Sequence, residues 1–228
     1  IEKLPQIIAG SRQKATLRAT KIFKKISKKI ITCQLKEAEF SKLYSNAFRY
    51  IQFAIANEFY MLADNIGLDF KKIRKITIDG YPRADALPSA GFAAGPCLYK
   101  DTMQLVSFSH NNFHLGYNSM LINEGLVLYI ANKLSKKFNL KNKVVGLLGM
   151  SFKAECDDTR SSLSYKLKNK LNSICKEVIC SDPYVKNDNT LQPLTKVLKK
   201  SDIIIKCIPH KIYKNLNVKK KFFLDIWN

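Results

Sequence analysis

The chain has 228 residues, of which 46% are hydrophobic, and a formal net charge of +21. This length allows one or two domains with hydrophobic cores, and this composition excludes an intrinsically disordered protein. No apolar run approaches the about 20 residues that a membrane-spanning helix needs, so we expect no membrane contact. The lysines are spread along most of the chain instead of clustering beside aromatic residues, which favours a solvated basic surface over nucleic-acid binding.

The cysteine and histidine positions argue against disulfides and metals. The six cysteines form no Cys-x-x-Cys pair, which is typical of reduced thiols in a cytoplasmic protein. We interpret Cys175 and Cys180 as core thiols. His110 and His114 have the spacing of a metal-binding pair on a helix, but no cysteine or carboxylate is placed to complete the site, so we expect no metal.

The start of the chain predicts the last β-α-β piece of an α/β domain. Residues 4–9 are typical of a short strand, and residues 29–33 predict a second one. Between them, Ser11 is placed to cap a helix over residues 12–29. Because the chain starts at Ile1 without an initiator methionine, we expect it to be a fragment.

The middle of the chain predicts a helical region. Periodicity and capping residues predict four helices: a long one over residues 36–66, a shorter one capped by Asp69, and two more over about 101–110 and 112–138. Gly67 ends the long helix. The segment over residues 79–97 is long for a connection and rich in Gly, Pro and Ala, and such loops are usually functional or disordered.

The hydrophobic period changes after Asn142. Short apolar strands alternate with helices there, with strands expected over 144–149, 178–182, 203–208 and 222–226, and helices near 160–175 and 191–199. This order predicts a parallel, Rossmann-like sheet. The pair Gly146 and Gly149 does not fit the GxGxxG spacing, so it is a weak dinucleotide fingerprint but a reasonable start for a ligand loop.

The stretch from Gly91 to Asp101 is the clearest candidate site. It places Cys97 directly after a Gly/Ala/Pro turn, with Lys100 three residues further on. Gly and Ala allow close approach of a ligand, and Pro96 fixes φ before the cysteine. A nucleophilic thiol needs such an accessible, rigid setting near positive charge. The alternative is a small buried apolar residue without a chemical role.

Two further pairs are candidates. Lys42 and Asn46 lie four residues apart on the long helix, where they could bind an oxyanion or a substrate hydroxyl. Lys153 and Arg160 flank residues 157–159, and either could meet a phosphate. For both pairs a simple solvated surface remains the alternative.

Taken together, several segments resemble the UDP-glucose/GDP-mannose dehydrogenases, NAD-dependent enzymes that oxidise a nucleotide-sugar alcohol to a uronic acid. The matching segments cover essentially the whole chain in the order of the family: Glu39-Phe-Ser-Lys42-Leu-Tyr-Ser-Asn46-Ala-Phe, Asn57-Glu58, Gly91-Phe-Ala-Ala-Gly-Pro-Cys97-Leu-Tyr-Lys100-Asp101, Leu121-Ile-Asn-Glu124-Gly, Gly149-Met-Ser-Phe-Lys153, Asp157-Asp-Thr-Arg160-Ser, Asp182-Pro-Tyr-Val185, Pro209-His210-Lys-Ile-Tyr213 and Asp225-Ile-Trp-Asn228.

The resemblance implies an α/β architecture in three parts. Residues 1–34 would be a remnant of the NAD-binding domain, residues 35–140 a helical dimerisation domain with a long connecting helix, and residues 141–228 a Rossmann-like UDP-sugar-binding domain. It also implies a nucleotide-sugar substrate, NAD as cofactor, and a homodimer or higher homo-oligomer. The family's GxGxxG domain is absent from the sequence, so we expect weak NAD binding by this chain.

The resemblance also implies a two-step, four-electron oxidation at C6, in which Cys97 carries a thiohemiacetal and then a thioester. Lys42 and Asn46 would stabilise oxyanions and orient water, and Asp101 would support both the water and the lysine. Family positions assign substrate contacts to Lys42, Asn46, Arg83, Gly95, Leu98 and Lys153, and NAD contacts to Lys100 and Arg160. Arg83 would correspond to an arginine that enters the site of a neighbouring subunit.

Two other functions stay open on the sequence. One is a non-catalytic remnant that binds a nucleotide sugar or a partner protein, and the other is a basic nucleic-acid-binding protein. The turn over residues 93–96 is less rich in glycine than in some relatives, which bears on sugar specificity more than on the chemistry.

Overall fold

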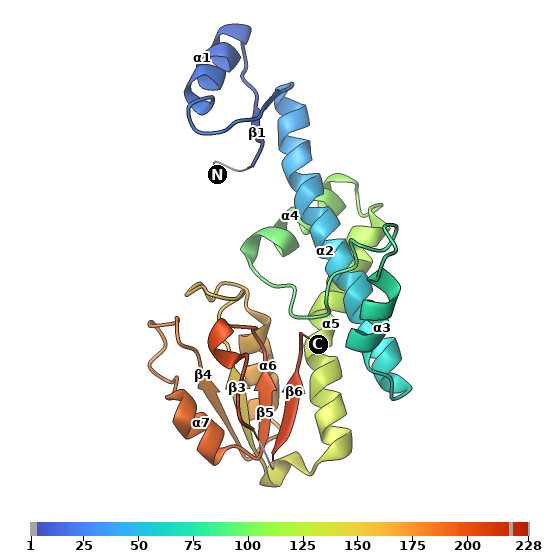
Figure 1. Cartoon of the computed structure of the whole chain (residues 1–228), viewed down its shortest axis with the longest axis vertical. Coiled ribbons are helices and arrows are strands. Elements are labelled where there is room, and N and C mark those ends of the chain that lie inside the picture. Colours follow the sequence, from blue (N-terminus) through green and yellow to red (C-terminus); the bar gives the residue numbers. More distant parts are fainter. Residues whose placement is uncertain (1–3, 219–220, 228) are drawn as a thin grey trace. The chain divides into compact units, whose positions relative to one another are not determined.

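The computed structural model describes residues 4–218 and 221–227 of the chain. The expectations that concern Ile1 and Asn228 lie outside the described residues. The chain divides into two compact units, residues 1–48 and residues 49–228, and each unit is described by itself (Figure 1).

The first unit contains a small β-α-β arrangement. β1 (Gln6–Ile8) and β2 (Ile30–Thr32) pair in parallel, and α1 (Gln13–Phe23) connects them. This confirms the predicted order of elements at the start of the chain. The exposed lysines and arginines of α1 leave its outer surface strongly basic.

The limits of α1 differ from the prediction. Arg12 occupies the N-cap position without a side-chain hydrogen bond, so the predicted cap at Ser11 was wrong. The helix also ends six residues early. Its expected last turn is replaced by a tight segment in which Ser27 is buried and donates a hydrogen bond from its hydroxyl to the carbonyl of Leu4 at 2.8 Å.

The long helix and its successor agree with the sequence pattern. α2 (Leu35–Asn65) matches the predicted range within a residue at each end, and Gly67 follows it with a φ of 75°, in the left-handed region that favours glycine. α3 (Phe70–Ile78) begins as predicted, because the Asp69 carboxylate accepts hydrogen bonds from two backbone N–H groups of its first turn, at 2.9 and 3.4 Å.

α4 (Pro96–Phe108) begins five residues earlier than predicted. Pro96 takes the first helical position, where its fixed φ suits the helix and its missing N–H is not needed. The Gly/Ala/Pro segment is therefore a loop that ends at Gly95, and Cys97 belongs to the helix. The Cys97 thiol therefore lies in the first turn of a helix and not in a loop.

α5 (His114–Lys137) is the second long helix. His110 precedes it in the connection from α4, with a φ of 51°, so His110 and His114 do not share a helix and the helical-pair spacing was misleading. Over the described ranges, no three His, Cys, Asp or Glu side chains gather as a metal site would require. Nor is any described helix long and apolar enough to cross a bilayer.

The C-terminal part of the second unit is a parallel sheet in the order β4-β3-β5-β6. The strands are β3 (Val144–Leu148), β4 (Glu177–Ser181), β5 (Ile203–Lys206) and β6 (Phe222–Asp225), and the helices between them are α6 (Leu163–Asn172) and α7 (Leu194–Lys200). The expected Rossmann-like sheet is confirmed. A short 3₁₀ helix, η1 (Leu140–Asn142), precedes β3, and a second one, η2 (Lys211–Tyr213), lies between β5 and β6.

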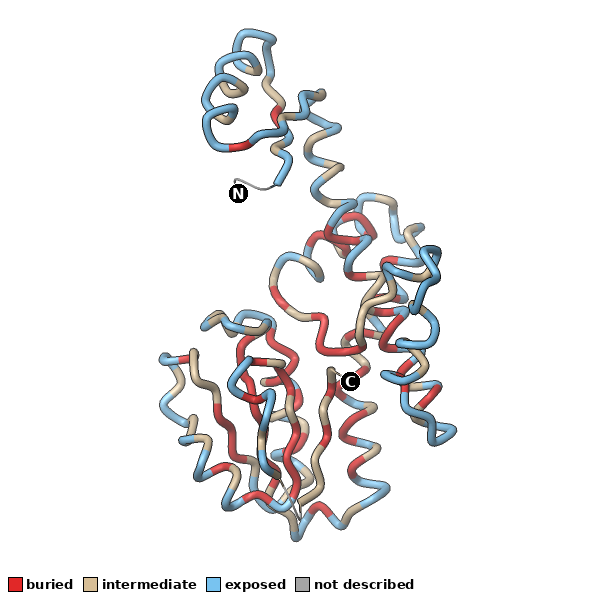
Figure 2. The backbone as a smooth tube through the Cα atoms, viewed as in Figure 1, coloured by how far each residue is buried: buried red, intermediate tan, exposed pale blue. Residues whose placement is uncertain are grey.

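Helices cover both faces of this sheet, as its apolar strands predict. Val145 and Leu147 of β3 pack with α5 and α6 on one face, while Leu148 packs with Val197 of α7 on the other. These side chains are fully buried, and buried residues run along the strands in Figure 2. Because all four strands are parallel, their carboxyl ends share one edge, where ligands of such sheets usually bind.

Candidate active site

The turn before α4 packs against two aromatic side chains that follow strands of the sheet, Phe152 after β3 and Trp227 after β6. A Cβ placed on Gly91 would overlap the indole of Trp227, and one placed on Gly95 would lie 2.6 Å from the ring of Phe152. Gly95 also has a φ of 102°, which residues with a side chain rarely adopt. Both positions therefore require glycine, because the turn approaches these rings closely.

Cys97 is the second residue of α4 and is exposed. Of the six cysteines, all within the described ranges, the other five are half-buried or buried. Burial raises the pKa of Cys180 to about 12, which keeps that thiol neutral and confirms it as a core residue, whereas Cys175 is half-buried. The first N–H groups of a helix carry partial positive charge, so Cys97 lies where developing negative charge is favoured.

Charged side chains surround this thiol. Lys100 Nζ lies 2.8 Å from Oδ1 of the buried Asp101, and this hydrogen bond raises the pKa of Lys100. Arg160, from the loop after β3, forms three hydrogen bonds with the Asp158 carboxylate, which raise the pKa of the guanidinium. Both cations lie near enough to Cys97 to interact with it electrostatically. The structure thus brings together Cys97, Lys100, Asp101 and Arg160.

The loop after β3 also places Lys153 beside the turn. Its Nζ lies 5.5 Å from the centroid of the Phe152 ring, which itself packs on Gly95. Lys153 is exposed and available to an anionic ligand. Leu98, the third residue of α4, is half-buried, and its carbonyl accepts a hydrogen bond from the Thr102 hydroxyl at 2.8 Å.

Three predicted residues are not brought into this cluster by the described geometry. Lys42 and Asn46 lie in the first unit on one face of α2, where Lys42 Nζ donates to Asn46 Oδ1 at 3.3 Å. Asn46 is buried and Lys42 is exposed. Their position relative to Cys97, in the second unit, stays a prediction. Arg83 is exposed in the segment between α3 and α4, and its role stays a prediction as well.

A buried hydrogen bond between His210 and Asp182 fixes the loop that carries Lys153. Nε2 of His210, after β5, lies 3.1 Å from Oδ2 of Asp182, after β4, and the same oxygen accepts the backbone N–H of Met150 and Ser151. Burial would raise the pKa of Asp182, but these hydrogen bonds lower it to about 2. His210 Nδ1 accepts the N–H of Glu155 at 3.0 Å, so three strand ends are tied together.

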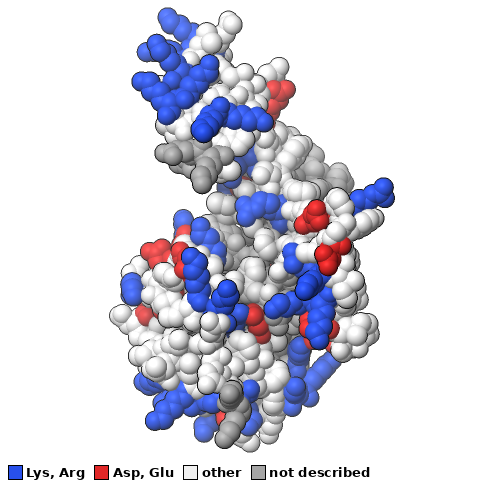
Figure 3. All heavy atoms as spheres, viewed as in Figure 1, with Lys and Arg blue, Asp and Glu red and all other residues white. Residues whose placement is uncertain are grey.

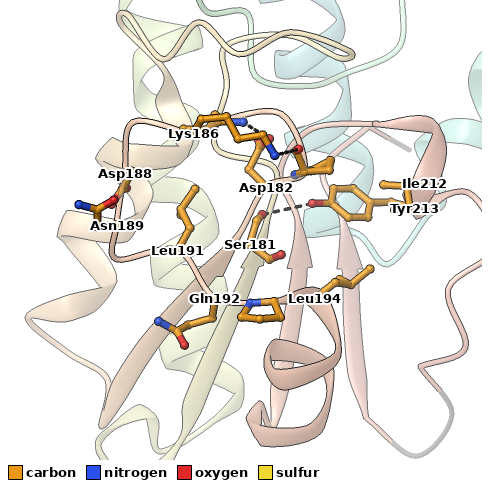
Figure 4. Close-up of a pocket in the computed structure, with 13 residues that line it drawn as sticks. Ser181, Asp182, Lys186, Asp188, Asn189, Leu191, Gln192, Leu194, Ile212 and Tyr213 are labelled. Atoms are coloured by element: carbon orange, nitrogen blue, oxygen red, sulfur yellow. Dashed lines mark hydrogen bonds between the residues drawn. The ribbon is translucent and has the colours of Figure 1, made fainter.

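A cavity of about 470 Å³ opens beyond the carboxyl end of β4 (Figure 4). The Tyr213 hydroxyl donates to the carbonyl of Ser181 at 3.2 Å at its base. The cavity is lined by Ser181, Asp182, Pro183, Val185, Lys186, Asp188, Asn189, Leu191, Gln192, Pro193, Leu194, Ile212 and Tyr213. None of the predicted site residues is among these, so the candidate active site is the Cys97 turn and not this cavity.

The basic character of the chain is visible on its surface. Lysine and arginine side chains are scattered over the face shown in Figure 3, with acidic side chains between them and a dense basic group over α1. This distribution follows the spread of lysines along the sequence. The net charge of +21 favours anionic ligands in general.

Two family models match the chain. Residues 36–124 match the central domain of the UDP-glucose/GDP-mannose dehydrogenase family, and residues 146–228 match the UDP binding domain of the same family. Among solved structures, a UDP-D-ManNAc dehydrogenase from Pyrococcus horikoshii is 28% identical, with a TM-score of 0.87 over 98% of this chain and 56% of that one. A UDP-glucose dehydrogenase from Pyrobaculum islandicum shares the fold, with a TM-score of 0.89 at 21% identity, over 100% of this chain and 56% of that one.

The curated relatives are also nucleotide-sugar dehydrogenases. The UDP-N-acetyl-D-mannosamine dehydrogenase of Pyrococcus horikoshii is 31% identical over 218 residues, which are 93% of this chain and 51% of the relative. The enzyme of that name from Methanocaldococcus jannaschii is 28% identical over 98% of this chain and 55% of its own length. The chain therefore spans about half the length of the curated relatives it matches.

The fold and the site define an α/β protein in which helices and a parallel sheet enclose a glycine-bounded turn with an exposed thiol. The two matched models lie in the order that the resemblance predicted and together cover most of the sequence. The chain belongs to the UDP-glucose/GDP-mannose dehydrogenase family.

Proposed function

We propose that this chain carries the thiol and the nucleotide-sugar-binding surface of an NAD-dependent nucleotide-sugar 6-dehydrogenase, which oxidises the C6 alcohol of a UDP-sugar to a carboxylate. The supporting observation is the exposed Cys97 at the N-terminal end of α4, with Lys100, Asp101 and Arg160 around it. The relatives named above are UDP-sugar dehydrogenases, which agrees with this chemistry.

In the proposed reaction the C6 alcohol loses a proton and a hydride to give an aldehyde. Cys97 Sγ adds to the aldehyde carbon and forms a thiohemiacetal. Loss of a second hydride from that carbon and of the proton from its hydroxyl gives a thioester. Water then attacks the thioester carbonyl, the C–S bond breaks, and the carboxylate product and the free thiol are released. NAD⁺, when bound, supplies the hydride acceptor for both oxidations.

The surrounding residues take complementary roles in this proposal. Lys42 and Asn46 stabilise the oxyanions that form at C6, and Asp101 orients the attacking water. Lys100 and Arg160 fit the pyrophosphate of the cofactor, because both are cations near Cys97 with mostly exposed side chains. Both are held by carboxylates, which limits their motion.

Three further residues contact the substrate in this proposal. Lys153 pairs with the diphosphate and the backbone at Gly95 and Leu98 borders the sugar, a role supported by the contacts of Lys153 and Gly95 with the same Phe152 ring. Arg83 extends from the segment after α3 toward the site of a second subunit in this proposal. The six free cysteines suit a reducing compartment such as the cytoplasm.

A second copy of this chain is the proposed partner. Large apolar side chains of α2 and α5 in the second unit are exposed, and they border a groove of about 440 Å³ between these helices. The groove is lined by Ile51, Ala54, Ile55, Glu58, Leu115, Asn118, Ser119, Leu121 and Ile122. Contiguous apolar surface of this kind marks a protein interface.

Calorimetric titration of the chain with UDP-glucose tests this proposal. We expect saturable binding of UDP-glucose, and GDP-mannose is the competing nucleotide sugar in the titration. Lys153→Ala removes one charge-assisted contact to the diphosphate, so the affinity should fall about tenfold or more. Lys141→Ala is the matched control, because Lys141 is an exposed lysine at the amino end of β3, away from the site. Absence of saturable binding by the folded chain would refute the proposal.

A further inference from the structure

Two buried asparagines hold the first residue of the thiol turn. Asn57 on α2 accepts the backbone N–H of Gly91 on Oδ1 at 2.8 Å and donates from Nδ2 to the Gly91 carbonyl at 3.0 Å. Its Nδ2 also donates to Asn123 Oδ1 on α5 at 2.9 Å, and Asn123 Nδ2 donates to the carbonyl of Tyr50 at 3.0 Å. Both asparagine side chains are completely buried.

This arrangement uses every hydrogen of the Asn57 amide. Both N–H donors and the carbonyl acceptor of the side chain have partners, and Gly91 supplies two of these three hydrogen bonds. Removing the amide would leave the N–H and C=O of Gly91 buried without partners, and each such group costs about 1–3 kcal/mol. Gly91 therefore has one strongly preferred position.

The opposite side of Gly91 is closed by Trp227. No Cβ fits between the Gly91 backbone and the indole, and the indole Nε1 donates to the carbonyl of Cys207 at 2.7 Å. Phe53 of α2 packs edge-on against the indole with 6.2 Å between ring centroids. The helices thus hold Gly91 through amide hydrogen bonds, and the sheet holds it through an aromatic ring.

Little freedom remains between this anchor and the thiol. Phe92 and Ala93 are buried, Gly95 is pressed on Phe152, and Pro96 starts α4. We infer that Asn57 and Asn123 are positioning residues for Cys97: they fix the turn that sets the thiol at the N-terminal end of α4. The inference rests on the proposed role of Cys97 in catalysis, but the contacts that carry it involve no ligand.

The alternative is that the amide pair only joins α2 to α5. The same two helices are joined about two helical turns away by Tyr129, whose hydroxyl donates to Asp64 Oδ2 at 2.6 Å. Tyr129→Phe breaks that link without touching the turn, so it is the matched control for Asn57→Leu. A purely structural role predicts the same outcome for both variants at the thiol.

The experiment measures the alkylation rate of each cysteine by iodoacetamide, with mass spectrometry of the cysteine-containing peptides of the folded chain. In Asn57→Leu we expect Cys97 to react at least threefold more slowly, because the loosened turn no longer holds the thiol in its exposed position near Lys100 and Arg160. The rate at Cys175, which lies beyond α6, should stay unchanged. In Tyr129→Phe both rates should equal those of the wild type.

Two independent measurements report on the turn itself. Trp227 is the only tryptophan, so its emission should shift to longer wavelength when Gly91 moves away and water reaches the indole. Hydrogen exchange of the amides over residues 91–95 should become at least tenfold faster. Asn123→Ser keeps both Gly91 bonds but removes support for Asn57, so smaller changes in the same direction are expected.

The inference is overturned if folded Asn57→Leu has the same Cys97 alkylation rate, the same amide exchange and the same Trp227 emission as the wild type. If Asn57→Leu does not fold, Asn123→Ser decides by the same criteria. None of these measurements requires a nucleotide sugar. If the wild-type chain does not bind UDP-glucose but Asn57→Leu shows the expected changes in labelling, exchange and emission, the proposed function alone is refuted. If the wild-type chain binds UDP-glucose but Asn57→Leu behaves like the wild type, the positioning role alone is refuted.

Discussion

At the scale of single residues, Asp182 shows how a buried charge is made tolerable. Its carboxylate is removed from water, which alone would be unfavourable, but His210 and several backbone N–H groups donate to it. The result is a pKa of about 2. Such a carboxylate stabilises the folded state only while it is ionised, so its contribution depends on pH.

We predict that Asp182→Asn will be more damaging at pH 5 than at pH 2.5. The folded-state pKa is depressed below the unfolded value near 4, so the stabilisation is present above about pH 4 and is lost as the pH falls toward 2. The difference in free energy of unfolding between wild type and variant should shrink by about 1–2 kcal/mol between these pH values. Urea unfolding at both pH values measures it, and an equal difference at both would contradict the assignment.

The sequence identified the candidate thiol but not the residues that support its turn. Cys97 stands out because Gly, Pro, Lys and Asp around it form a recognisable chemical setting. Asn57 and Asn123 appeared as matching family positions without a role. Their signal was a polar residue within an apolar helical face, but Asn57 bonds Gly91 at a separation of 34 residues and Asn123 at a separation of 66, and no local rule links them. The contacts of Trp227 are equally non-local.

At the scale of elements, periodicity predicted the strands and helices well and their ends less well. All six strands in the part of the chain that the structure describes were expected, because short apolar runs bounded by turns have few alternatives. The start of α4 was missed because Gly and Pro dominated the interpretation of the loop, although proline at the first helical position is common. The placement of Lys42 and Asn46 relative to Cys97 stays a prediction.

The turn before α4 permits a direct test of why it needs glycine. Gly95 and Gly67 both have positive φ, but a Cβ on Gly67 meets open space, whereas one on Gly95 meets the Phe152 ring. We predict that Gly67→Ala costs about 1 kcal/mol through the backbone alone and that Gly95→Ala costs about 2–4 kcal/mol, because overpacking adds to it. Urea unfolding of the two variants compares them.

A second substitution separates the two contributions. Phe152→Leu removes part of the ring that the new methyl group would meet, so Gly95→Ala combined with Phe152→Leu should cost less than the sum of the two single changes. Equal losses for Gly67→Ala and Gly95→Ala would show that backbone strain alone explains the glycine at this position.

At the scale of the whole molecule, the exposed apolar groove between α2 and α5 is the feature that the proposed dimer accounts for. Ile55 is 42% exposed and Leu121 is 50% exposed, and both line this groove. A monomer would leave these side chains in water, whereas a self-complementary contact would bury them on both copies at once. The same contact would repeat around a symmetry axis.

We predict that Ile55→Glu and Leu121→Glu each convert a dimer into a monomer in sedimentation velocity at micromolar concentration. A glutamate at this position would have to be buried without a partner, and each 1.4 kcal/mol of that penalty weakens association tenfold. Ile76→Glu is the control, because Ile76 is 77% exposed on α3 and does not line the groove. Dissociation by Ile76→Glu as well would place the interface elsewhere, and a wild type that sediments as a monomer at every concentration would remove the dimer from the proposal.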